Sequence, residues 1–265
     1  MPRGIIMTTC RLIAASVLSL AAAAAQTNTA IPRLPDGKPN LNGIWQTLNT
    51  ANYNIQDHAA SKGIPGGQGV VVGNEIPYQP GGLEKRKENF LNRATLDTES
   101  KCWLLGVPRI TYSGHPFQIF QASNGDKVTI LYEYAHTNRF VYTNNTPHPK
   151  GPIDWWMGDS RGHWEGNTLV VETTNFLQGF RGSDPETYKM VERITRVDAT
   201  NLKREITFID PHTWTKPWTV LIEMGKDKDD SKHMIFDSAC HEGNYGLTGL
   251  LVGTRREEQA AANKK

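Results

Sequence analysis

The sequence has few cysteines, no excess of charge of either sign and no long apolar stretch beyond its first residues. Its 265 residues include three Cys, and Lys and Arg outnumber Asp and Glu by only two. Without a basic surface, the chain has no electrostatic means of holding nucleic acid or an anionic membrane. No segment after residue 25 is long and apolar enough to predict a membrane span. These absences leave enzymes, small-molecule carriers and structural proteins as the function classes.

The first 25 residues have the pattern of a secretory signal peptide. Arg3 and Arg11 make the start positive, residues 12–25 are apolar, and small residues at 23–25 form a cleavage pattern before Gln26. The apolar part is too short for a transmembrane helix. We therefore expect residues 1–25 to be removed and the mature protein to be periplasmic or secreted. Loss of the two Arg makes the numbers of basic and acidic residues equal.

Cleavage would also remove Cys10 and leave Cys102 and Cys240. In an oxidising compartment, two cysteines most simply form one disulfide. A bond between them would close most of the chain into a loop, worth roughly 4–5 kcal/mol on the chain-entropy model. The alternative is a nucleophilic Cys240 beside His241, although a free exported thiol is oxidised readily. The sequence thus predicts a disulfide and keeps the reactive thiol as the alternative.

The short spacings of common metal and nucleotide sites are missing. The sequence has no H-x-H or H-E-x-x-H pattern, and the Gly-rich segment 62–82 has no Lys-Ser/Thr after it. A metal could be held only if His136, His148 and His241 met through the fold. We therefore expect no metal and no cofactor.

From residue 110 onward the chain alternates between strand patterns and turn signals, with little helix and no βαβ alternation. Turns such as S-N-G-D and E-G-N separate the strands. We expect strands at 41–48, 118–122, 127–142, up to 164, 168–175, 190–197, 202–209, 216–224 and 233–240. An antiparallel meander of eight or nine strands closes most simply into an up-and-down barrel. The predicted fold class is therefore an all-β, lipocalin-like barrel.

The remaining segments are expected to surround a single barrel domain, residues 41–256. An extended Pro-rich arm precedes it at 26–40, and a tail follows it at 257–265. Inside the domain, residues 62–82 predict a long loop because they are rich in Gly and Pro. Residues 83–93 predict one short capping helix with apolar residues on one side.

Two sets of motifs resemble known families. Gly43-Ile44-Trp45 resembles the G-x-W signature of lipocalin-type barrels, in which the Trp closes one end beneath an Arg of the last strand. The resemblance implies that Arg255 or Arg256 supplies this cation. Longer stretches such as "KCWLLGVPR", "YEYAHTNRF" and "ACHEGNYGL" resemble a large family of exported bacterial proteins of unassigned function. That resemblance implies one intact domain and carries no catalytic residue.

Residues 131–142 alternate like a strand but place polar aromatic side chains on one face. This face carries Tyr132, Tyr134, His136, Asn138, Phe140 and Tyr142, and the other carries Leu131, Glu133, Ala135, Thr137, Arg139 and Val141. Aromatic rings with hydroxyl tips suit the wall of a ligand cavity. We therefore expect the even-numbered face to point into the barrel, with Glu133 and Arg139 as an ion pair or as surface groups.

His136 lies midway along the expected inner face, and it has two interpretations. One is a hydrogen-bonded member of a polar core, and the other is a general acid or base that titrates near neutral pH. In the second, Tyr134 would stabilise an oxyanion, and Asp159 or Glu242 would orient the imidazole, with His241 on the rim. The expected ligand-binding residues are Tyr132, Phe140, Tyr142, Trp156, Trp164 and Tyr245.

The stretch "GDSRGHWEG" suggests a second kind of chemistry, because Asp159, Ser160 and His163 lie close together in the sequence. A Ser–His–Asp triad depends on geometry that three residues of one short loop seldom reach. Turn capping by Asp159 and Ser160 is the simpler interpretation.

Two functions follow from these patterns. The first is a cofactor-independent lyase, isomerase or hydrolase in which a barrel-enclosed His acts on a small apolar or aromatic molecule. The second is a lipocalin-like carrier or sensor that binds such a molecule unchanged. The ionisable groups of residues 132–172 favour the enzyme, and the G-x-W motif favours the carrier. Neither pattern indicates an oligomeric state.

Overall fold

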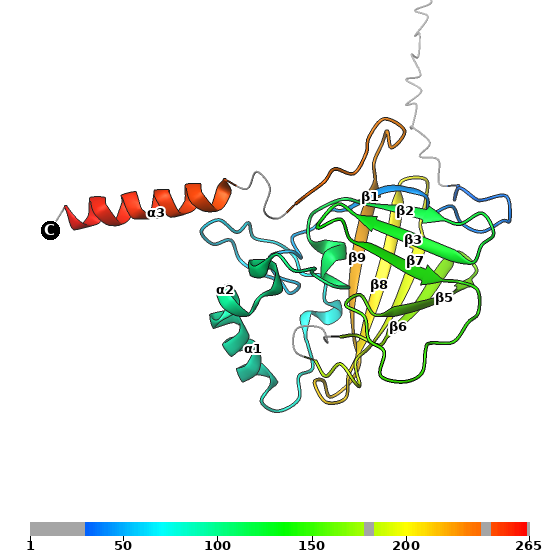
Figure 1. Ribbon diagram of the computed structural model, residues 1–265, viewed down its shortest axis with the longest axis horizontal. Coiled ribbons are helices and arrows are strands. Elements are labelled where there is room, and N and C mark those ends of the chain that lie inside the picture. Colours follow the sequence, from blue (N-terminus) through cyan, green and yellow to red (C-terminus); the bar gives the residue numbers. More distant parts are fainter. Residues whose placement is uncertain (1–29, 178–182, 240–244, 264–265) are drawn as a thin grey trace, which may run out of the picture.

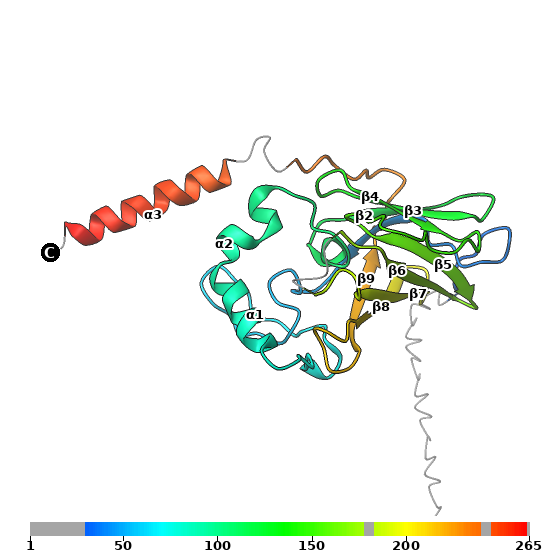
Figure 2. The same cartoon turned by 60° about the horizontal axis from the view of Figure 1, so that its bottom comes forward.

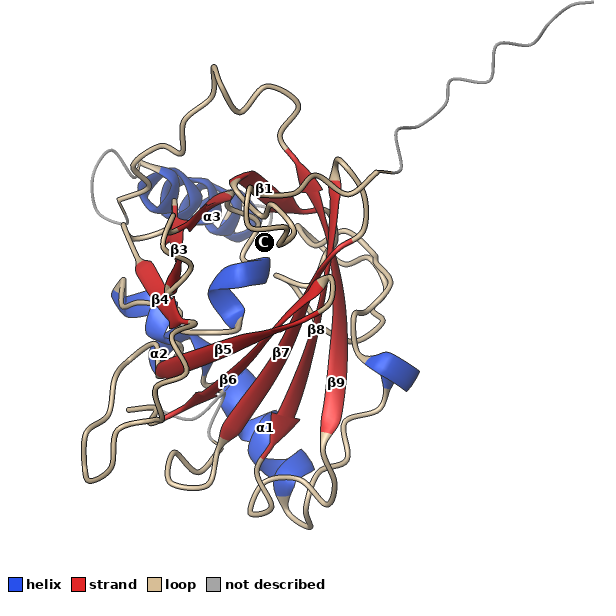
Figure 3. Ribbon diagram, turned by 90° about the vertical axis from the view of Figure 1, so that its right-hand side faces the viewer, coloured by secondary structure: helices blue, strands red, loops and turns tan. Residues whose placement is uncertain are grey.

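The computed structural model describes residues 30–177, 183–239 and 245–263 (Figure 1). In these ranges nine strands form a closed barrel in sequence order, and β9 pairs with β1 to complete it. The predicted all-β barrel of eight or nine strands is confirmed. Figure 3 shows β5 to β9 as tilted neighbours along one side of the wall. The strands are β1 Gly43–Thr47, β2 Phe117–Gln121, β3 Lys127–Tyr132, β4 Asn138–Tyr142, β5 Asp159–Glu165, β6 Thr168–Thr174, β7 Lys189–Arg196, β8 Asn201–Ile209 and β9 Trp218–Lys226.

One neighbouring pair departs from the expected antiparallel meander, because β4 and β5 run parallel. Strand directions cannot alternate all the way round a closed ring with an odd number of strands, so one parallel pair is required. Parallel neighbours need a long connection, and residues 143–158 supply it. The β4–β5 pair has only two register partners, Val141 with Ser160 and Tyr142 with Arg161. It is the shortest seam in the wall.

The expected strand at 127–142 is two strands, β3 and β4, joined by a tight turn. Ala135 and His136 adopt left-handed backbone conformations there, with φ of 54° and 50°. The turn inverts the alternation, so Tyr132 on β3 is buried while Arg139, not Phe140, is buried on β4. The predicted inner face is right for β3 and wrong for β4.

The expected strand at 233–240 is also wrong over its described residues 233–239, where the chain crosses the outside of the barrel. We call residues 227–238 the strap. It leaves β9 with Asp227 N–H donating to the Ile44 carbonyl at 2.9 Å. It ends beside the β3–β4 turn, where Ser238 forms an isolated bridge with Tyr134. The mixed charges of residues 226–233 give no alternation that a strand could use.

The α-helices lie outside the barrel. The helix expected at 83–93 is present as α1 Gly82–Leu91, followed by α2 Arg93–Leu96, and none of their residues is buried. Residues 257–262 of the expected tail belong to α3 Gly246–Ala262, which stands apart from the barrel in Figures 1 and 2. Short 3-10 turns are η1 Val72–Asn74, η2 Thr98–Lys101 and η3 Arg109–Tyr112. Within the described ranges, no helix is both long enough and apolar enough to cross a bilayer.

Aromatic side chains close both ends of the barrel. At one end Trp45 is fully buried, and the Arg196 guanidinium lies 4.6 Å from its ring centroid. The expected Trp–Arg stack therefore exists, but the Arg comes from β7. Arg255 and Arg256 are exposed on α3, so their assignment was wrong. At the other end Phe208 stacks on Trp218 with centroids 4.1 Å apart.

Candidate functional site

His136 does not lie in the barrel interior. It is exposed in the β3–β4 turn, and its Nε2 contacts the Asp237 carboxylate of the strap. The prediction of a barrel-enclosed His136 was wrong, because the turn at Ala135 and His136 carries the side chain away from the wall. His136 instead ties the end of the strap to the turn.

The other residues of the predicted acid–base site have partners of their own. Tyr134 is buried, with its ring 5.4 Å from that of His115. Asp159 accepts hydrogen bonds from Arg161 Nε at 2.7 Å and Arg161 Nη2 at 2.9 Å, and pairs with His148 Nδ1 at 2.7 Å. The fold therefore disperses this set. Cys240, His241 and Glu242 lie outside the described residues.

Residues 158–162, Gly-Asp-Ser-Arg-Gly, match the letters of the G-x-S-x-G nucleophile elbow. That elbow requires a sharp strand-to-helix turn, whereas these residues begin β5, which continues as a strand. Ser160 is buried, bonds to Arg139 and Thr173, and has no contact with His163, which is exposed and pairs with Glu165. The geometry gives no Ser–His–Asp triad.

The six expected ligand-binding residues occupy different surroundings. Tyr132 is buried in the barrel and Trp164 packs partly against the core. Phe140 lies under Lys127 and Tyr142 under Arg161, both on the outside of the wall. Trp156 donates to the Leu104 carbonyl at 2.8 Å, and Tyr245 is exposed. Of the six, Tyr132 lies in the barrel interior that the sequence indicated, and Trp164 packs against that core.

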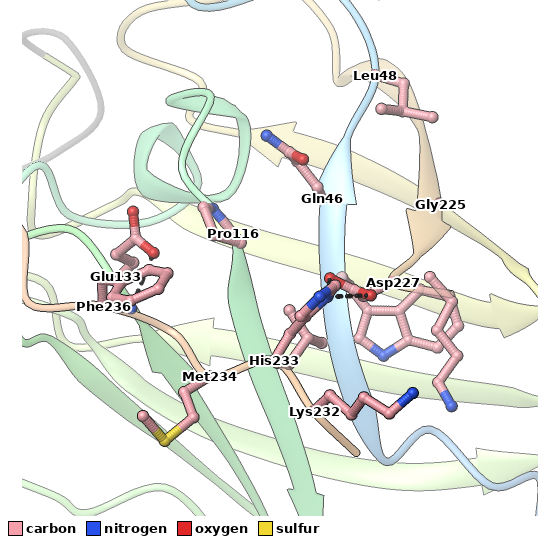
Figure 4. Close-up of a pocket in the computed structure, with 13 residues that line it drawn as sticks. Gln46, Leu48, Pro116, Glu133, Gly225, Asp227, Lys232, His233, Met234 and Phe236 are labelled. Atoms are coloured by element: carbon pink, nitrogen blue, oxygen red, sulfur yellow. Dashed lines mark hydrogen bonds and ion pairs between the residues drawn. The ribbon is translucent and has the colours of Figure 1, made fainter. Parts of the chain in front are cut away.

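A pocket of about 560 Å³ lies between the strap and the outer face of β1 (Figure 4). We call it the strap pocket. Its volume is within the usual range for small-molecule sites. The strap contributes one wall and the barrel contributes the other. The lining residues are Ile44, Trp45, Gln46, Leu48, Pro116, Glu133, Gly225, Lys226, Asp227, Lys232, His233, Met234 and Phe236.

An ion pair lies at the strap pocket. His233 Nδ1 contacts both carboxylate oxygens of Asp227, at 2.8 and 2.9 Å, and Figure 4 shows the two side chains facing each other. The hydrogen bond to Asp227, followed by the charge of that carboxylate, raises the pKa of His233 above its ordinary value. The pKa of Asp227 is lowered by a backbone hydrogen bond from Asp229 and by His233. The imidazole is therefore oriented, and its protonated form is favoured.

The barrel interior holds a charged cluster that the sequence reasoning missed. Arg139 on β4 and Arg204 on β8 both donate to the Glu192 carboxylate on β7, and all three side chains are at most 2% exposed. Arg139 also donates to Ser160 Oγ at 3.0 Å and to Thr173 Oγ1 at 2.9 Å. We call Arg139, Glu192 and Arg204 the interior cluster. A readable signal existed for Arg204, which is the one charge among the otherwise apolar inward residues of β8.

Burial and charge act against each other in the interior cluster. Burial alone would raise the pKa of Glu192, but Arg139 and Arg204 lower it to about 2. Burial would likewise lower the pKa of Arg204, but Glu192 and then Tyr132 raise it above its ordinary value. The Tyr132 hydroxyl lies beside Arg204 and has no hydrogen-bond partner of normal geometry among the described residues. Glu192 and Arg204 are thus both charged at neutral pH.

The described residues contain no group of three or more His, Cys, Asp or Glu arranged to hold a metal ion. No family model, curated protein or solved structure matches the chain. The site must therefore be interpreted from its own chemistry.

Proposed function

We propose that this protein binds a small, mainly apolar molecule in the strap pocket, with His233 holding a polar group of that molecule. The observation that carries the proposal is the oriented His233–Asp227 pair at the edge of an otherwise largely apolar pocket. Small-molecule sites typically combine apolar walls with a few placed polar groups.

The apolar part of the proposal rests on three exposed side chains around the pocket. Leu48 is 74% exposed, Met234 is 72% exposed and Phe236 is 74% exposed. Large apolar side chains that gather on a surface mark binding sites more often than single ones do. A ligand that covers these three side chains would remove them from water, at about 25 cal/mol per Å² of apolar area.

The polar part rests on His233. Its Nδ1 is held by Asp227, and its Nε2 makes no hydrogen bond to any described residue. A protonated imidazole held in this way donates through Nε2, so it would favour a carbonyl, alkoxide or carboxylate oxygen of the ligand. Lys232 and Lys226 line the same pocket but are paired with Asp229 and Asp230.

The same pair supports a second candidate function, an acid–base enzyme. A His whose pKa is raised by a carboxylate can give its Nε2 proton to a substrate oxygen and recover it from water. In this version His233 replaces His136 as the proton carrier, because His233 lines a pocket and His136 does not. Lyase, isomerase and hydrolase chemistry each need one such proton transfer.

Export and the Cys102–Cys240 disulfide belong to the same proposal. The signal pattern at residues 1–25 supports a periplasmic or secreted protein, and an oxidising compartment supports the disulfide. Mass spectrometry of the non-reduced mature protein would detect either the bond or two free thiols.

The binding proposal is tested with the mature chain and a thermal-shift screen of small aromatics, terpenoids and short fatty acids. Each hit is then titrated against wild type, Phe236→Ala and His233→Gln. We expect both substitutions to weaken binding about tenfold, since each removes roughly 1.4 kcal/mol of contact. His163→Gln is the matched control, because this His is as exposed as His233 but pairs with Glu165 on β5.

Turnover of each hit, followed by mass spectrometry, separates the two candidates. A ligand recovered unchanged from wild type makes the protein a carrier. A ligand consumed by wild type and only bound by His233→Gln makes it an enzyme. Equal affinity of wild type and Phe236→Ala for every hit would place the binding site elsewhere.

A further inference from the structure

The Arg139 guanidinium, inside the barrel, has hydrogen-bonding capacity that the described protein does not use. Nε donates to Ser160, and Nη2 donates to Thr173 and Glu192. Nη1 is fully buried and has no hydrogen-bond partner among the described residues. Buried donors are nearly always paired, and those of a charged group are the most costly to leave unpaired. An acceptor for Nη1 is therefore expected.

The interior cluster also carries unbalanced charge. Two guanidinium groups share the Glu192 carboxylate, which leaves one positive charge in a water-poor interior. The other buried carboxylates have their own partners: Asp159 pairs with Arg161 and His148, and Asp210 accepts from Thr187 and Thr213. Burying an unpaired charge costs several kcal/mol even after relaxation. A neutral acceptor would satisfy Nη1 but would leave this charge.

Two tyrosine hydroxyls beside the cluster also have no partner among the described residues, those of Tyr132 and Tyr188. Tyr188 is buried next to Glu192 and Arg139, and its pKa is raised first by burial and then by neighbouring groups that include Tyr112 and Glu192. Each hydroxyl can donate one hydrogen bond. Together with the two N–H groups of Nη1, they are donors without acceptors.

We infer that the barrel interior is a second binding site, separate from the strap pocket, for a small carboxylate anion held by Arg139, Tyr132 and Tyr188. A carboxylate has two oxygens that accept hydrogen bonds, and these would satisfy Nη1 and the two hydroxyls. Its single negative charge would balance the excess positive charge of the interior cluster. The aromatic rings at both ends favour a small anion over a long-chain lipid, with Trp45 closing one end and Phe208, Trp214 and Trp218 the other.

The site is tested by titrating the mature protein with sodium formate and sodium acetate at pH 7 and fixed ionic strength. Samples are equilibrated overnight, because both ends of the barrel are closed, and the melting temperature is measured. We expect a saturable rise with formate or acetate and none with acetamide, which has the shape of acetate without its charge. Chloride, at matched concentration, distinguishes a carboxylate site from a general anion site.

Three variants assign the effect to these residues. Tyr132→Phe and Tyr188→Phe keep the rings and remove only a hydroxyl without a protein partner, so both should fold and bind acetate about tenfold more weakly. Arg139→Met should abolish the saturable rise. Arg193→Met is the matched control, since this exposed Arg lies on the outer face of β7 and should leave the titration unchanged.

The inference fails if acetate and acetamide raise the melting temperature equally, or if the rise never saturates. It also fails if both tyrosine variants bind as tightly as wild type, which remains decisive should Arg139→Met not fold. Tighter saturable binding of chloride than of acetate would overturn the carboxylate assignment. None of these outcomes bears on the strap pocket, whose own variants lie outside the barrel.

Discussion

Arg139 on β4 reaches Glu192 on β7 across the inside of the barrel, although β5 and β6 lie between them in the wall. On the way it bonds to Ser160 of β5 and Thr173 of β6. Its side chain thus joins four consecutive strands at the short parallel seam between β4 and β5. Because β4 and β5 share few backbone pairs, the side-chain hydrogen bonds of Arg139 reinforce the barrel where its strand pairing is shortest.

Glu192→Gln is expected to destabilise the protein by about 3–5 kcal/mol, because it leaves two buried guanidinium groups without their shared counter-charge. Urea unfolding at pH 7 measures this change. Glu165→Gln is the control, since Glu165 is about half exposed and its pair with Arg193 should contribute little to stability. A loss below about 1 kcal/mol for Glu192→Gln would contradict the role given to the interior cluster.

Acid should remove the stabilisation that Glu192 provides. Its pKa is about 2 in the folded protein, against an ordinary value of 4.5. Because the folded value is depressed, the contribution is complete above about pH 4.5 and is lost as the pH falls towards 2. The difference amounts to about 3 kcal/mol. Unfolding curves from pH 7 to 2 should therefore show the gap between wild type and Glu192→Gln closing over this range, and a constant gap would refute it.

Gly158→Ala should cost about 1–3 kcal/mol, because two penalties combine at the start of β5. Gly158 has a φ of 68°, and a Cβ there would lie 2.7 Å from Thr173 Cγ2 and 2.9 Å from the Thr174 carbonyl oxygen. Gly151→Ala separates the two penalties, since Gly151 has a φ of 99° but a Cβ added there would meet no atom within 4 Å. Thermal unfolding should show the larger loss for Gly158→Ala, and equal losses would mean that crowding contributes nothing.

His136→Ala is expected to change stability by less than about 1 kcal/mol, because its pair with Asp237 is more than half exposed on both sides. If the strap pocket hosts turnover, this variant should retain it within a few-fold, whereas His233→Gln should lose two or more orders of magnitude. Steady-state kinetics on a turned-over ligand makes the comparison. If His136→Ala instead lost turnover a hundredfold while still binding the ligand, His136 in the β3–β4 turn would be the proton carrier.

Sequence patterns predicted the barrel because strand alternation and turn residues are local signals. The hairpins around Gly166 and between β7 and β8 were read correctly, since each turn and its two strands lie in one short stretch. The strand at 127–142 was misread because a five-residue turn without Gly interrupts it, and alternation cannot report such a break. The error moved His136 from the surface to the interior and Arg139 from the interior to the surface.

The sequence by itself determined the all-β class and most of the strands, because these depend on neighbours in the chain. Only the tertiary structure decided that β4 and β5 run parallel, that Arg196 covers Trp45 and that the strap encloses a pocket against β1. It also decided that charges from β4, β7 and β8 meet inside the barrel. Closure of the sheet brings together residues that are far apart in the sequence, and no local pattern records which inward positions will then face each other.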